Sequence, residues 1–203
     1  MITILLIIAS CVCSIYIFQN PFLIEKYCFN PYIVLKEKQW YRVVSHAFVH
    51  ADWGHLLVNM FVLYSFGSFV EMAYSELFGK FARLFYVVLY FGGIFFAVIP
   101  SFVLRKNDSS YNSVGASGMV SSILFSSIVL NPTSPISFMF IPIDIPAYLF
   151  GILYLAYSAY MANKANDNIA HDAHFSGAIW GVVFTIALYP EIVKYYFGLL
   201  LSF

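Results

Sequence analysis

Long apolar runs separated by short polar stretches dominate the pattern of this chain. A helix that crosses a bilayer needs about 20 mainly apolar residues, and runs of roughly that length recur along the sequence. They predict six spanning helices, at residues 2–18, 54–74, 80–104, 115–130, 147–161 and 173–189. Pro21, Pro132 and Pro190 follow three of these runs, as expected where helices end.

The stretches between the runs differ in kind. Residues 22–53 mix charged and aromatic side chains, and they are too polar to span and too apolar to float free, so we expect them at the membrane interface. Residues 132–146 are rich in proline and predict a turn, whereas residues 163–172 predict a polar loop. The tail, residues 190–203, is too short to cross again and is expected to form an interfacial helix.

Composition favours a polytopic membrane protein. Of the 203 residues, 62% are hydrophobic and 10% are charged, and the mean hydropathy is +0.82, whereas soluble domains are roughly 45–50% apolar and about 25% charged. The zero net charge gives no reason to expect a nucleic-acid partner. With no internal repeat visible, the expected fold class is one all-α membrane domain over residues 1–203, surrounded by the lipid bilayer.

The first apolar run is expected to be retained as a spanning helix. Residues 8–11 resemble a lipoprotein cleavage box, but no Lys or Arg precedes the run, as a signal peptide requires. Cys11, Cys13 and Cys28 are odd in number and lack the spacing of a metal site or a disulfide framework. The cysteines therefore predict no cofactor.

Residues 111–127 carry the first candidate for chemistry. They open with polar, loop-forming residues and pass through the sequence GASG, where Ser117 stands between small neighbours at the start of an apolar helix. Such a setting can present a nucleophile, because small neighbours leave room for a substrate carbonyl. A packing face of small residues would look similar. If this short helix begins inside the membrane, water must reach Ser117, since irregular backbone at depth is tolerated only within protein or around a wet cavity.

His174 is the matching candidate for a base. Gly177 and Gly181 follow it on one helical face, and two glycines allow a neighbouring helix to approach closely. A matching surface of small residues follows Ser117, namely Gly118, Ser121 and Ser122. Packed together, these helices would bring imidazole and hydroxyl into the geometry of general base catalysis. Asp172 lies on the wrong side of the helix, so we expect a dyad; a hydrogen-bonded helix-end histidine is the alternative.

A second group of polar residues surrounds the start of the second predicted span. His55 and Asn59 are one helical turn apart, so both can donate hydrogen bonds to the same oxyanion. Asn59 could equally pin a helix contact. A metal site is a further alternative, since His46, His50 and His55 have plausible ligand spacing, although few carboxylates or thiolates accompany them in the predicted spans.

Three sequence blocks strongly resemble the signature blocks of rhomboid intramembrane serine proteases. They are HAFVHADWGHLLVNM at 46–60, GASG at 115–118 and AHFSGAIWG at 173–181, in the family's order. Arg42 resembles the arginine of the family's first-loop motif. Glu71, in the stretch GSFVE, resembles the acidic residue late in the second span.

The resemblance implies a six-helix bundle with an interfacial first loop and a family core at about residues 40–189. It also implies hydrolysis of a peptide bond in or beside a transmembrane segment of another protein, without metal or cofactor. By motif, Ser117 would be the nucleophile and His174 the base, with His55, Asn59 and the Ser117 N–H as the oxyanion hole. The residues with structural roles would be Arg42, His46, His50, Glu71, Gly115, Gly118, Gly177 and Gly181.

Ser121 is a departure from the family pattern. Some relatives have a tyrosine one turn after the nucleophile that packs on the catalytic imidazole, so something else must hold the ring of His174 in this chain. A catalytically inactive relative that binds membrane helices is a third reading, which the presence of both Ser117 and His174 disfavours.

The resemblance further implies a multi-pass protein of the cell or inner membrane, with a cytoplasmic N-terminus and an active site that opens outward. On that topology most Lys and Arg residues lie on the outer side, in conflict with the positive-inside rule. Transmembrane-anchored proteins are the expected substrates in either orientation.

Overall fold

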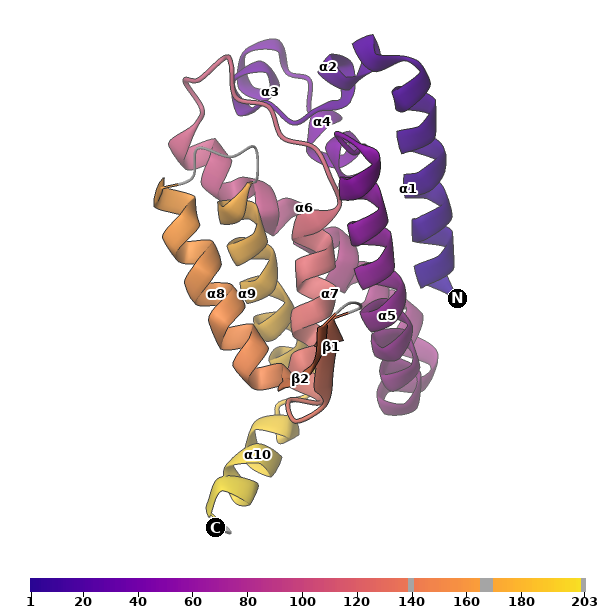
Figure 1. The fold of residues 1–203 in the computed structure, drawn as a ribbon, viewed down its shortest axis with the longest axis vertical. Helices are drawn as coiled ribbons and strands as arrows, with labels where there is room; N and C mark the ends of the chain where they lie inside the picture. The colour runs from indigo at the N-terminus through magenta and orange to yellow at the C-terminus, as the bar shows by residue number, and fades with distance from the viewer. Residues whose placement is uncertain (139–140, 165–169, 202–203) are drawn as a thin grey trace.

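The computed structural model of the chain describes residues 1–138, 141–164 and 170–201. Helices dominate this part of the chain, and a short antiparallel hairpin lies between two of them, α7 and α8 (Figure 1). The long helices are α1 (Ile2–Gln19), α5 (Trp53–Phe78), α6 (Ala82–Leu104), α7 (Ser117–Leu130), α8 (Ala147–Lys164), α9 (His171–Leu188) and α10 (Glu191–Leu201). All the predicted spans correspond to helices, with ends displaced by a few residues.

Helix α7 lies in the middle of the bundle, between α5, α6, α8 and α9 (Figure 1). Its residues from Gly118 to Ile128 are all buried, which explains why this helix is apolar on every side. The surrounding helices keep large apolar side chains on their outward faces, including Leu57, Val103 and Ile152. Such faces suit a lipid environment, because water-soluble monomers rarely expose wide apolar surfaces.

Helix length separates two clear membrane spans from the rest of the described chain. The stretches Ile2–Gln19 and Trp53–Leu104 are long and apolar enough to cross a bilayer, and the second contains both α5 and α6. The apolar helices Ser117–Leu130 and Ala147–Ala162 are shorter. The number of six crossings therefore stays a prediction.

The chain between α1 and α5 folds into short helical pieces at one end of the bundle (Figure 1). Its centre is Arg42, a buried guanidinium that donates to the carbonyl oxygens of Glu25 (2.7 Å) and Cys28 (2.9 Å). Phe29 pairs with Ser113 through two backbone hydrogen bonds, which attach this first loop to the linker before α7. The pieces are η1 (Pro21–Leu23), α2 (Ile24–Tyr27), α3 (Pro31–Glu37), α4 (Arg42–Ser45) and η2 (His46–Phe48).

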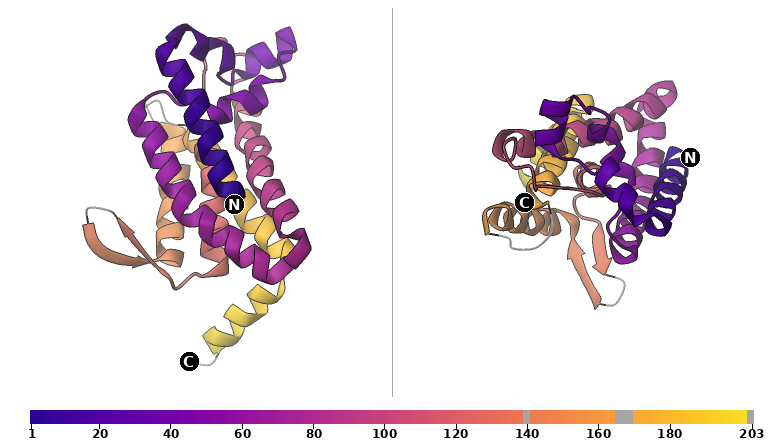
Figure 2. Two further views of the ribbon diagram at one scale, coloured as in Figure 1. Left: turned by 90° about the vertical axis from the view of Figure 1, so that its right-hand side faces the viewer. Right: turned by 90° about the horizontal axis from the view of Figure 1, so that it is seen from above.

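Two sequence-based expectations about the connections are corrected. The proline-rich stretch is a hairpin of β1 (Pro135–Phe138) and β2 (Ile141–Pro146), so the fold is not strictly all-α. Both prolines that pair across it stand at strand ends, where a missing N–H is tolerated. The expected polar loop at 163–172 is also shorter, because α8 continues to Lys164 and α9 begins at His171; residues 165–169 lie outside the described part. Figure 2 shows the hairpin and α10 projecting from the bundle.

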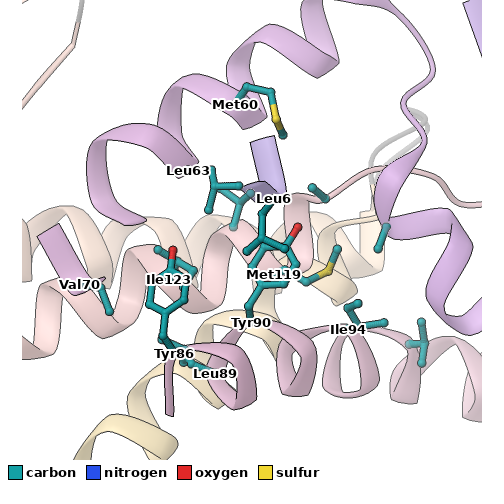
Figure 3. Close-up of a cluster of buried hydrophobic side chains, with 14 of the residues drawn as sticks. Leu6, Met60, Leu63, Val70, Tyr86, Leu89, Tyr90, Ile94, Met119 and Ile123 are labelled. Carbon is teal, nitrogen blue, oxygen red and sulfur yellow. The ribbon is translucent and has the colours of Figure 1, made fainter. Parts of the chain in front are cut away.

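A buried apolar cluster joins α1, α5, α6 and α7 (Figure 3). Leu63 of α5, Tyr86 and Tyr90 of α6, and Ile123 of α7 are fully buried in it, and Leu6 brings α1 into the same cluster. This packing sets the mutual positions of α5, α6 and α7, the frame on which the site described below is built.

Glu71 on α5 fastens the start of α1. Its carboxylate accepts hydrogen bonds from the N–H of Ile2 (2.6 Å), the N–H of Thr3 (3.0 Å) and the hydroxyl of Thr3 (2.7 Å). The same Thr3 hydroxyl is 2.8 Å from the Tyr86 hydroxyl. An acidic side chain thus satisfies N–H groups that the first turn of a helix leaves unpaired.

We expect Glu71→Ala to loosen α1. Hydrogen bonds to a charged group contribute about 1.5–3 kcal/mol each, and because they are not additive we expect a loss of roughly 3 kcal/mol. In a domain of this size that corresponds to a fall of about 6–12 °C in melting temperature, measurable in detergent. Glu76→Ala, which removes an exposed carboxylate from the same helix, is the control. Equal melting temperatures for the two variants would contradict the assigned role.

Candidate active site

The backbone before Ser117 is held by the first loop. The N–H of Gly115 donates to the carbonyl oxygen of His46 (2.9 Å), and the N–H of Ala116 donates to Nε2 of His50 (3.3 Å). Gly115 has a φ of +118°, and a Cβ there would lie 2.5 Å from Cε1 of His55. Only glycine fits this position, because both the backbone angle and the adjacent ring exclude a side chain.

Helices α7 and α9 touch through their backbones. A Cβ added to Gly177 would overlap the carbonyl oxygen of Gly118, and one added to Gly181 would overlap that of Ser122. Gly118 follows Ser117 directly, and Gly177 is one helical turn after His174. The contact therefore brings together the first turns of the two helices, which carry the Ser117 hydroxyl and the His174 imidazole.

Ser117 and His174 line one cavity of about 590 Å³ together with His55 and Asn59 of α5. Both Ser117 and His174 are half-buried. The other lining side chains are mainly apolar and come from α5, α7 and α8, among them Val58, Val62, Val120, Leu124, Phe150 and Tyr154. All four residues that the sequence singled out for chemistry thus lie around one space.

A second hollow of about 500 Å³ adjoins this cavity. The two share His55, Ser113 and Ala170 among their lining residues, and the second adds the charged side chains Arg105 and Asp172. Asp172 accepts a hydrogen bond from the N–H of Ala173 (2.9 Å). The hollow with the charged side chains thus borders the cavity that Ser117 lines.

The oxyanion candidates lie in the first turns of α5. Asp52 caps this helix by accepting from the N–H of His55 (2.8 Å). Asn59 is buried, and its Nδ2 donates to the carbonyl oxygen of His55 (2.8 Å). This bond uses one of the two amide hydrogens and orients the group, so the second hydrogen remains for a ligand in the cavity.

His50 connects three segments as a neutral imidazole. Because Nε2 accepts from Ala116, its proton is on Nδ1, which donates to Oγ of Ser14 (2.9 Å) in α1. Ser14 in turn donates to the carbonyl oxygen of Phe48 (3.1 Å). Burial, and to a lesser degree the neighbouring His55, lower the pKa of His50 to about 3.

His46 and Arg42 support the same loop from the side away from the cavity. Nδ1 of His46 is 3.0 Å from the carbonyl oxygen of Arg42, and its ring packs on Phe29. Burial lowers the pKa of His46 to about 4. Glu71 lies farther along α5 and is outside the cavity; its carboxylate binds the first residues of α1. Within the described residues, no three His, Cys, Asp or Glu side chains are grouped to hold a metal ion.

Tyr154 is a lining residue with a polar group that the sequence analysis did not single out. Its ring is stacked on His174, with centroids 6.3 Å apart and an interplanar angle of 19°, and its hydroxyl is 2.7 Å from Oγ of Ser121. Ser121 therefore faces α8 and not α9, unlike Gly118 and Ser122. The sequence held no signal for Tyr154, because α8 presents several tyrosines and its inward face was not known.

Comparison with known proteins assigns the family. The rhomboid domain model matches residues 37–191, more than half of the chain. The chain belongs to the rhomboid family. Rhomboids are membrane-embedded and are generally intramembrane serine proteases.

Two relatives from Arabidopsis thaliana illustrate how far this rhomboid has diverged. "RHOMBOID-like protein 12, mitochondrial" is 27% identical over 153 residues, which are 70% of this chain and 45% of the relative. "Rhomboid-like protein 11, chloroplastic" is 32% identical over 158 residues, 71% of this chain and 51% of the relative. The chain spans about half the length of these curated relatives. Their names refer to organelles, and location in a cell or inner membrane stays a prediction for this chain.

The neutral loop histidines of this rhomboid predict loss of stability in acid. Both folded pKa values lie below the ordinary value of about 6.5, so the unfolded chain binds more protons between that value and the folded ones. The contribution of the two histidines to the free energy of unfolding is fully present above about pH 6.5. It falls as the pH decreases, by up to about 1.4 kcal/mol per pH unit for each histidine.

Melting temperatures in detergent between pH 7 and pH 5 test this dependence in a range above most carboxylate titration. We expect His50→Gln to melt at a lower temperature than wild type at pH 7, but to lose less of its stability on going to pH 5. An unchanged pH dependence in the variant would show that His50 does not contribute.

Proposed function

We propose that this rhomboid is an intramembrane serine endopeptidase. It hydrolyses peptide bonds in or next to transmembrane segments of other membrane proteins, through a dyad of Ser117 and His174 and without a metal or cofactor. The observation that carries the proposal is the shared cavity: a serine at a helix start, an imidazole from the closely packed α9 and two hydrogen-bond donors from α5 line one space. We also propose that the bundle crosses the membrane six times, with the first loop at the interface.

In the reaction, the Ser117 hydroxyl attacks the scissile carbonyl while the His174 imidazole takes its proton. The imidazolium then gives this proton to the leaving amine, and the acyl-enzyme ester forms. Water entering through the polar hollow attacks the ester, with His174 again as base. Hydrolysis releases the acid product and restores the serine.

The negative charge that develops on the carbonyl oxygen is stabilised from two directions. His55 and the second amide hydrogen of Asn59 approach from α5. The N–H of Ser117 lies in the first turn of α7, where unpaired N–H groups and the helix dipole favour a negative charge. Donors fixed in this way need no rearrangement during the reaction.

The substrate must present an extended backbone to Ser117. A transmembrane helix keeps its carbonyl groups in internal hydrogen bonds, so cleavage requires that the segment unwinds first. Glycine and other weak helix formers near the scissile bond lower that cost, by about 1 kcal/mol per glycine relative to alanine. Transmembrane-anchored proteins with such residues are the substrate class we propose.

A serine-reactive fluorophosphonate probe tests the nucleophile. We expect wild type in detergent to be labelled, and Ser117→Ala to lose all labelling, because the reacting oxygen is removed. Ser65→Ala is the matched control, since it removes an exposed hydroxyl that donates only to its own helix, at the carbonyl oxygen of Phe61. Equal labelling of the Ser117 and Ser65 variants would exclude Ser117 as the nucleophile.

Asn59→Ala is expected to slow cleavage of a membrane-anchored substrate by about 10²–10³-fold, the usual effect of losing one oxyanion donor. Expression and folding should be retained. Asn20→Ala is a close control, because Asn20 makes the same type of bond to the carbonyl oxygen four residues earlier, at Tyr16. Asn20 follows the C-terminal end of α1 and does not line the cavity. A variant of Asn59 as active as that of Asn20 would remove Asn59 from the mechanism.

A further inference from the structure

The His174 imidazole faces a ring from a third helix, neither the one that carries Ser117 nor its own. The Tyr154 ring of α8 lies nearly parallel to it, with centroids 6.3 Å apart. Offset stacking at this separation is a favourable arrangement for aromatic side chains. The orientation of the imidazole therefore depends on the position of the Tyr154 ring.

Tyr154 is itself fixed by contacts with α7. Its hydroxyl is 2.7 Å from Oγ of Ser121, one helical turn after Ser117, and its ring packs against Phe125 with centroids 5.4 Å apart. A hydroxyl inside a membrane protein that loses its hydrogen bond is costly. The Tyr154 ring thus keeps its orientation while α8 is packed against α7.

A second aromatic contact joins α8 and α9. Tyr157, one turn after Tyr154, meets the buried His171 edge to face at 5.6 Å, and His171 meets His174 at 6.0 Å. Two tyrosines spaced by three residues on α8 therefore match two histidines spaced by three on α9. Helix α8 therefore contacts the His174 ring directly, through Tyr154, and indirectly, through Tyr157 and His171.

Helix α8 also forms a wall of the cavity. Phe150 and Tyr154 line it together with Val58 and Asn59 of α5. The outer face of α8 carries exposed apolar side chains, including Ile152, so this helix is at the periphery of the bundle. A segment that enters between α5 and α8 must pass the side chain that contacts the imidazole.

We propose that Tyr154 is a positioning residue that holds the His174 imidazole through the hydrogen bond with Ser121, so that proton transfer depends on α8 being packed against α7. The proposal rests on the proposed protease function. Ser121 fixes the Tyr154 ring by the hydrogen bond, and the Tyr154 ring holds the imidazole by stacking on it.

The first test compares turnover of a membrane-anchored substrate in variants of α8. Tyr154→Leu is expected to lower kcat about 10–100-fold with KM changed less than about twofold, since a small misplacement of a catalytic group can cost about 10²-fold. Tyr154→Phe keeps the ring but removes the hydrogen bond to Ser121, so it should lower kcat less, about threefold. Tyr160→Leu, a change of an exposed tyrosine two turns along the same helix, should match wild type.

The second test is a double-mutant cycle, which holds even where Tyr154→Leu fails to fold. Tyr154→Phe and Ser121→Ala each remove one end of the same hydrogen bond, so each should lower kcat about threefold. The double variant should be no slower than either single one, because the two changes act on one interaction. Independent, multiplicative losses would overturn the proposal.

Fluorophosphonate labelling separates the possible failures. Where wild type is labelled and cleaves substrate but Tyr154→Leu retains the kcat of Tyr160→Leu, the role of Tyr154 is wrong and the protease function stands. Where wild type is neither labelled nor active on a panel of membrane-anchored substrates, the proposed function fails and this inference fails with it.

Discussion

The close contact between α7 and α9 is the constraint on which the rest of the structure depends. Gly177 and Gly181 bring the α9 backbone onto the carbonyl groups of Gly118 and Ser122, with no room for a side chain between them. Inside a membrane, lipid competes with protein for apolar surface, so helices associate by close packing and hydrogen bonds more than by water exclusion. The same contact that stabilises the bundle brings the helix starts of Ser117 and His174 together, and both residues line one cavity. Stability and proposed chemistry therefore share one interface.

A polar network in the first loop completes this arrangement at the end of α7. Buried backbone groups in an irregular loop need partners within the protein, and here imidazoles and hydroxyls provide them. His50 binds the N–H of Ala116 on one side and Ser14 of α1 on the other. The loop thus links the first helix to the residue that precedes Ser117. Neutral, buried histidines suit this task, since each has one donor and one acceptor in a fixed ring.

Much of this could be predicted from the sequence, because membrane spans and glycine spacing leave strong local signals. Runs of apolar residues marked every long helix, and the spacing of His174, Gly177 and Gly181 marked a face for close packing. The hairpin at β1 and β2 was missed, since its prolines read as a turn and strand pairing is a non-local property. Tyr154 was missed for a related reason: its role depends on which face of α8 turns inward, and the low amphipathicity of a helix between lipid and apolar core does not reveal that.

The packing around His174 connects a small residue on α7 with an aromatic residue on α8. A serine at position 121 leaves space on α7, and its hydroxyl needs a partner in an environment without bulk water. Tyr154 satisfies both requirements, because its ring fills the space and its hydroxyl meets the serine. The consequence of the proposed stack is that the imidazole is held by α8, a peripheral helix that also lines the cavity. On the proposed mechanism, proton transfer by His174 therefore depends on how tightly a helix at the edge of the bundle packs against its centre.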